Sequence, residues 1–190
     1  MNMNTRTFCG MIRNRSEENR QAIQSFFRLH GVLSPSLSIL RQELDSMIRV
    51  IYLLAVNDIT ERQRLIDSTL RGERWKVRNI RGKWRDVTDR EMVDLAQQLQ
   101  GWTKSVYKFG CAFVHLSDFH NHLVENPFDK LEEPEKQDIL SHMRHYHGGP
   151  CHDNPDMAEL SLYVPQVFEK IASNLECYLK QLEQDEILDE

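Results

Sequence analysis

Thiol, imidazole and carboxylate side chains gather in one stretch of the sequence, FGCAFVHLSDFHNH (109–122). Several of them follow the i, i+4, i+7, i+11 spacing that places residues on one face of an α-helix, and two lysines continue this face toward its N-terminal side. An imidazole titrates near neutral pH, so it can serve as a general acid or base, and all three groups can bind metals. We call this candidate site the helix strip; it consists of Lys104, Lys108, Cys111, His115, Asp118 and His122.

Two other interpretations of the helix strip stay open. Polar residues opposite a core stripe are the ordinary solvated surface of a bundle helix. A metal site is the second alternative, but seven residues of straight helix separate His115 from His122 by roughly 10 Å, so the strip alone cannot close a four-ligand site. We therefore expect no bound metal ion and no cofactor. The side chains that would have to complete such a site lack paired zinc spacing: His142, His145, His147, Cys151, His152 and Asp153.

A basic segment, RGERWKVRNIRGKWR (71–85), carries seven Lys or Arg residues against one Glu in a chain of net charge −5. Cations of this kind contact phosphates, and tryptophan rings stack on unpaired bases. The sequence thus predicts RNA as a partner, although a solvated linker whose tryptophans cap the bundle is an equal alternative. The candidate nucleic-acid-binding residues are Arg74, Trp75, Arg78, Arg81, Trp84 and Arg85.

The elements that must position these residues are helical wherever the periodicity is strong. Only the alternation within 75–87 predicts a loop or one short hairpin. We therefore expect an all-α fold, an antiparallel bundle of about five to six helices. The helices are expected to begin near Ser16, at Ser34, at Thr60, at Thr88, before Ile139 and near Val164.

The helix that begins at Thr88 is expected to continue to about Val124, with Gly101 and Gly110 as candidate bends. It would carry the helix strip on one side. His120 falls on the opposite, apolar side, where a buried imidazole hydrogen-bonded within the core is expected.

Composition predicts a single domain over residues 1–182, followed by an acidic, solvated C-terminal tail over 183–190. The 190 residues include no apolar run of signal-peptide or membrane-spanning length, so we expect a cytoplasmic protein without membrane contact. Glycine-rich phosphate loops are absent. Reduced thiols are expected at the four widely spaced cysteines, Cys9, Cys111, Cys151 and Cys177.

Two stretches, LRQELDSMIRVIYLLAV (40–56) and YKFGCAFVHLSDFHNH (107–122), resemble the small helical bundles of the HEPN superfamily. The resemblance implies a metal-independent ribonuclease of toxin or defence systems, usually dimeric, whose site is an Arg followed four to six residues later by a His on one helix. His115 matches that histidine, whereas Lys108 stands on the same face where the family has Arg, and Lys lacks the bidentate fork.

Two functions follow as expectations. The resemblance implies an RNA-binding or RNA-cleaving protein with Lys108 and His115 as the catalytic pair. The alternative is a non-enzymatic helical interaction module, a homodimer or an adaptor, in which the helix strip is inert surface.

Overall fold

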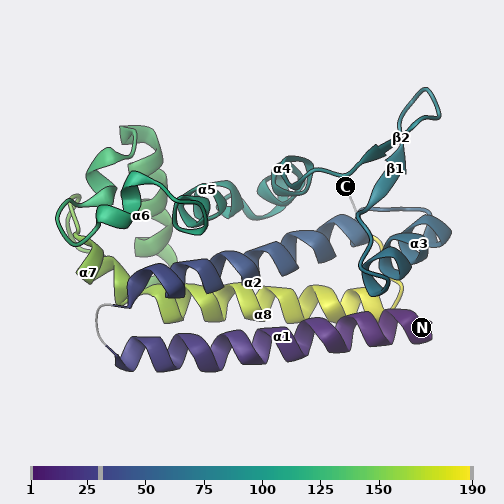
Figure 1. The fold of residues 1–190 in the computed structure, drawn as a ribbon, viewed down its shortest axis with the longest axis horizontal. Helices are drawn as coiled ribbons and strands as arrows, with labels where there is room; N and C mark the ends of the chain where they lie inside the picture. The colour runs from purple at the N-terminus through teal and green to yellow at the C-terminus, as the bar shows by residue number, and fades with distance from the viewer. Residues whose placement is uncertain (1, 30–31, 189–190) are drawn as a thin grey trace.

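Three long helices lie side by side in the computed structural model, which describes residues 2–29 and 32–188 (Figure 1). They are α1 (Met3–Arg28), α2 (Leu33–Leu54) and α8 (Val164–Glu183). Each carries apolar residues at the helical period, so they pack against one another to bury these stripes. Helix α2 lies at the centre, and its Leu44, Met47, Ile48 and Ile51 are fully buried.

The remaining elements cover the other side of α2 or extend from the ends of the three long helices (Figure 1). The all-α prediction is confirmed, and so is the short hairpin, in which β1 and β2 are antiparallel. These elements are α3 (Ile59–Leu70), β1 (Lys76–Arg78), β2 (Trp84–Asp86), α4 (Asp89–Gln100), α5 (Thr103–Val114), the 3-10 turns η1 (Asp118–Asn121) and η2 (Pro127–Lys130), α6 (Glu133–His147) and α7 (Met157–Ser161).

The directions of the long helices follow from side-chain pairs and from the chain ends. Arg13 of α1 pairs with Glu176 and Glu183 of α8, and Arg20, further along α1, pairs with Glu169, so α1 and α8 are antiparallel. Helices α2 and α8 run in the same direction and end together (Figure 1). The core therefore contains one parallel pair among antiparallel neighbours.

The prediction of one continuous helix from Thr88 to about Val124 is wrong. Gly101 adopts a left-handed conformation with φ of 73° and ends α4. Its neighbour α5 ends at Val114, because His115 has extended backbone angles and the Ser117 hydroxyl donates to the Ala112 carbonyl at 2.6 Å. A hydroxyl that bonds a late carbonyl in this way competes with further helix.

The first helix also begins earlier than expected. Asn2 accepts a hydrogen bond from the Asn4 amide and caps α1, so Ser16 lies in the helix interior instead of at its start. The Ser16 hydroxyl donates at 2.5 Å to Glu43 of α2, whose other oxygen accepts from Asn19. This buried carboxylate is thus fully engaged by α1 and fixes how the two helices align.

The acidic tail is exposed over residues 184–187, and its backbone is anchored to the end of α2; residues 189 and 190 lie outside the described residues. The buried guanidinium of Arg62 donates to the carbonyls of Leu54, Val56 and Glu186. The Leu188 amide also donates to the Leu54 carbonyl. Both contacts satisfy carbonyls at the C-terminus of α2, which has no further turn to bond them.

All four cysteines are free thiols. Burial and the nearby Glu183 carboxylate raise the pKa of Cys9 to about 12, so this thiol is an inert part of the core. Among the described residues, no helix is both long and apolar enough to cross a membrane.

Candidate functional site

The helix strip is divided among three segments in the structure. Lys104, Lys108 and Cys111 lie on α5, Asp118 begins η1 and His122 follows it. His115 is the first residue after α5 and is exposed. The prediction that these residues share one helical face is therefore wrong, because the end of α5 at Val114 removes the geometry on which it rested.

The charged residues of the strip are paired with neighbours. The Lys108 ammonium lies 2.5 Å from a carboxylate oxygen of Glu135 on α6. Lys130 lies 3.0 Å from Asp118 and 2.8 Å from Glu125. Lys108, the cation of the predicted catalytic pair, thus already has a carboxylate partner within the protein.

The histidines after α5 hold a turn together. The Ser117 amide donates to Nδ1 of His120 at 3.3 Å, so this imidazole closes η1 as part of a capping box and is half-buried, rather than buried in a helix core. Burial and the adjacent His120 lower the pKa of His122, whose Nδ1 has no hydrogen-bond partner among the described residues. Both rings pack against Phe113, which indicates a structural role.

A buried arginine on α2 forms a cluster next to the strip. The Arg41 guanidinium lies 3.5 Å from the centre of the Tyr107 ring and 3.6 Å from Asp45. Although burial opposes its charge, contacts with Cys111, Tyr107 and Asp45 raise the pKa of Arg41. Sequence analysis missed this residue because it stands within the apolar stripe of α2 without any motif.

The first tryptophan of the basic segment belongs to the bundle. Trp75 is only 5% exposed, its indole N–H donates to the Thr69 hydroxyl at 2.7 Å, and its ring packs on Tyr52 with centroids 5.8 Å apart. The prediction that Trp75 stacks on a base is wrong, because its ring is already covered by protein. Trp75 instead attaches the hairpin to the body.

The second tryptophan is available to a partner. Trp84 is 52% exposed and lies between two guanidinium groups, those of Arg64 at 4.9 Å and Arg78 at 5.0 Å from its ring centre. Cross-strand partners share one face of a sheet, and Trp84 pairs with Arg78. An aromatic ring and a cation therefore stand side by side on this face.

The cations of the hairpin fall into two groups. Arg74 pairs with Asp86 at 3.9 Å, and Arg85 pairs with Glu91 at 2.6 Å, so these two predicted contacts are partly neutralised. Within residues 2–29 and 32–188, the others form no ion pair, and they lie on the hairpin, which projects from the body (Figure 1). These exposed cations are Lys76, Arg78, Arg81 and Lys83.

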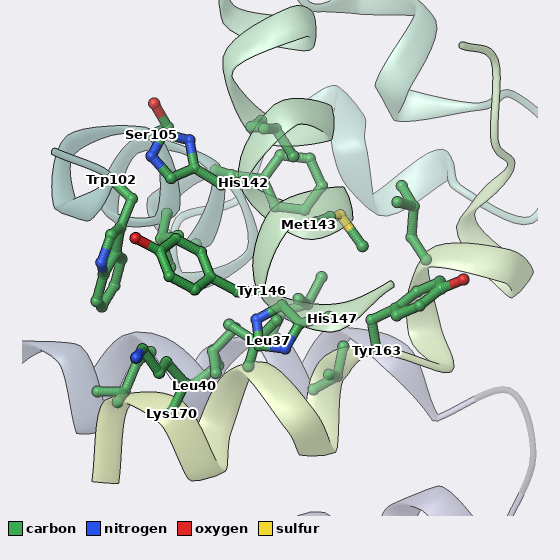
Figure 2. Close-up of a pocket in the computed structure, with 18 of the residues that line it drawn as sticks. Leu37, Leu40, Trp102, Ser105, His142, Met143, Tyr146, His147, Tyr163 and Lys170 are labelled. Carbon is green, nitrogen blue, oxygen red and sulfur yellow. The ribbon is translucent and has the colours of Figure 1, made fainter. Parts of the chain in front are cut away.

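An apolar pocket of about 110 Å³ lies on the far side of the molecule from the hairpin, among α2, α5, α6, α7 and α8 (Figure 2). Its walls are almost entirely carbon, from residues such as Leu37, Leu40, Trp102 and Phe109. Polar groups line it at Ser105, His142, Tyr146, His147, Tyr163 and Lys170. The sequence carries no signal for this pocket, because its residues come from separate stripes that each look like ordinary core.

The histidines of segment 142–152, which would have to complete a metal site, lie apart from one another. His142 bonds the Asp138 carbonyl through Nδ1, His147 lines the pocket, and His152 lies 3.0 Å from Glu159. Among the described residues, no group of three His, Cys, Asp or Glu side chains is placed to hold a metal ion.

The fold and these features define an all-α protein with a projecting basic hairpin and a separate apolar pocket. Comparisons of the chain with protein-family models, with curated proteins and with solved structures found no match. The HEPN resemblance stays a prediction. A function must therefore be inferred from the side chains themselves.

Proposed function

We propose that this protein binds single-stranded RNA through its basic hairpin and does not cleave it. The observation that carries the proposal is the group of four exposed cations, Lys76, Arg78, Arg81 and Lys83, which have no carboxylate partner among the described residues. Phosphates attract such cations strongly because counterions are released on contact. In a chain of net charge −5, cations left unpaired on one projecting element favour a polyanionic partner.

The arrangement of the two strands favours an unpaired strand over a duplex. Lys76 and Arg78 lie on one face of β1, and Trp84 stands opposite Arg78 on the same face. A base can stack on the exposed part of the Trp84 ring while the cations contact the phosphates on either side. The pairing thus combines the two interactions that hold single-stranded nucleic acids.

The absence of cleavage is inferred from the contacts of the predicted catalytic pair. Lys108 is neutralised by Glu135, and His115 lies beyond the end of α5. A general base needs a fixed position relative to a phosphate clamp, and these two residues belong to different local structures.

The test replaces Lys76, Arg81 and Lys83 together with Gln and measures binding to a short unstructured RNA by fluorescence anisotropy. Affinity at low salt should fall roughly tenfold or more, and the plot of log affinity against log salt should become shallower by about 0.7 for each lost contact. The matched control replaces the exposed Arg6, Arg15 and Arg28 of α1, which changes the net charge equally. An equal loss in both variants, or none in the first, contradicts the proposal.

The same RNA reports on cleavage. We expect the parent protein and His115→Ala to bind it equally and to leave it intact. A cleavage product that disappears in His115→Ala would instead support the ribonuclease interpretation.

A second candidate function is the interaction module, a homodimer, and exposed apolar side chains favour it. Phe27, Leu123, Val124 and Leu162 are each exposed, and all four line one groove of about 390 Å³ between the end of α1, the segment after η1 and α7. Contiguous exposed apolar surface is a common mark of protein contacts. We call these four residues the apolar groove.

A further inference from the structure

The pocket in Figure 2 has an apolar interior and a positively charged border. Leu37 and Leu40 of α2 lie on one side of it and Trp102 lies on another, and Phe109 also belongs to the lining. Its volume of about 110 Å³ suits a single small ring, since an apolar cavity of about 150 Å³ in an engineered protein takes up benzene. Aromatic edges in the wall favour an aromatic occupant.

Lys170 of α8 supplies the positive charge at the border. It is half-buried, and its ammonium lies 5.0 Å from the centre of the Tyr146 ring. No described residue forms an ion pair with it, and the residues three and four positions away on α8 are uncharged: Gln166, Val167, Ser173 and Asn174. The charge of Lys170 is therefore left without a counter-charge in a partly desolvated place.

His147 of α6 lines the same pocket as this lysine. Burial and the charge of Lys170 lower the pKa of His147, and its ring nitrogens have no hydrogen-bond partner among the described residues. The other titratable groups that line the pocket offer no negative charge: His142 is an imidazole, and Tyr146 and Tyr163 are phenols. Asp138 is not part of the lining, and Ser105 and His142 engage it. A ligand that brings one negative charge would interact favourably with both Lys170 and His147.

We propose that this pocket binds a small aromatic carboxylate, with the ring in the apolar interior and the carboxylate at Lys170 and His147. The ring fits the volume and the aromatic walls, and the carboxylate supplies the missing counter-charge. This site is independent of the hairpin, which lies at the other end of the molecule (Figure 1).

Isothermal titration calorimetry with phenylacetate and its neutral isostere phenylacetamide tests the proposal. Phenylacetate should bind at least tenfold more tightly, because only the carboxylate can form a charge-assisted hydrogen bond with the Lys170 ammonium. Lys170→Gln should remove that advantage, so that the two compounds bind with similar affinity. The control Lys180→Gln, on the same helix but outside the pocket, should bind phenylacetate as the parent does. Equal affinity for the two compounds, or no detectable binding of phenylacetate at millimolar concentration, overturns the proposal.

The position of the ligand is tested with Val167→Phe, which fills the pocket with a larger side chain. This variant should bind neither compound, and its far-UV circular dichroism spectrum should match that of the parent. Unchanged binding would place the ligand elsewhere and overturn the assignment. If this variant does not fold, the comparison of phenylacetate with phenylacetamide in the parent and in Lys170→Gln still tests the proposal.

Proton uptake gives an independent readout of His147. Burial and the charge of Lys170 lower the pKa of His147 in the free protein, and a bound carboxylate beside the imidazole should raise it, so binding should take up protons. Phenylacetate affinity should then increase as the pH falls from 8 to 6, and His147→Asn should remove this dependence. An affinity independent of pH in the parent contradicts the placement of the carboxylate beside His147.

Discussion

The two tryptophans at the base of the hairpin differ in what their rings contact. Trp75 is covered by Tyr52 and bonded to Thr69, whereas Trp84 has half of its surface free and the guanidinium groups of Arg64 and Arg78 over its ring. Both residues look alike in the sequence, as aromatic residues in a basic segment. Which of the two rings is buried depends on which side of the hairpin packs against α2 and α3. That packing brings together residues distant in the chain, so the local sequence does not reveal it.

Trp84→Ala should weaken RNA binding by about 1–3 kcal/mol, the value of one lost base stack, with little change in the free energy of unfolding. Trp75→Ala should do the opposite and lower the free energy of unfolding by about 3–5 kcal/mol, because it opens a cavity and leaves Thr69 unpaired. Anisotropy titrations and urea denaturation of both variants check the two effects. A stability loss as large for Trp84→Ala as for Trp75→Ala would refute the assigned roles.

At the scale of the elements, periodicity predicts α2 and α8 well, because their apolar stripes are long and uninterrupted. The same reasoning fails from Thr88 to Val124, where the apolar residues keep a helical spacing across breaks at Gly101 and after Val114. Gly101 was a candidate bend and ends a helix. Ser117 gave no comparable signal, because its bond to the Ala112 carbonyl depends on a turn that forms only afterwards.

Gly110 remains inside α5 for a reason of packing. A Cβ atom there would lie 2.9 Å from Cβ of Arg41, so Gly110→Ala should push α5 away from α2 and lower the free energy of unfolding by about 1–3 kcal/mol. Gly10 of α1 is the matched control, because a Cβ there meets nothing within 4 Å. Gly10→Ala should raise stability by about 0.5–1 kcal/mol through helix propensity alone. Urea denaturation of both variants measures the two changes in stability. Stabilisation by Gly110→Ala would contradict the close approach of α2 and α5.

At the scale of the whole molecule, composition and periodicity predict the all-α class but not which helices become neighbours. The apolar groove illustrates this, because Leu123 lies within the helix that was expected to continue to about Val124 and is instead exposed after η1. The pocket was missed for the same reason. Both features arise where segments distant in sequence meet.

If the apolar groove joins two copies, the parent protein should sediment as a dimer at micromolar concentrations. Leu123→Asp together with Leu162→Asp should yield a monomer of unchanged thermal stability, since both side chains are exposed. The control Ile80→Asp places the same charge at the fully exposed hairpin tip and should leave association unchanged. A parent that sediments as a monomer at every concentration contradicts the homodimer.

The central position of α2 also determines when the protein can fold during synthesis. Its apolar surface is covered on one side by α1 and on another by α8, which the ribosome delivers last among the helices described. A nascent chain shorter than about residue 164 therefore leaves part of the α2 stripe exposed to water and to other chains. Native packing around α2 is completed only after most of the polypeptide has left the exit tunnel, and until then the unfinished core exposes apolar surface that chaperones can bind.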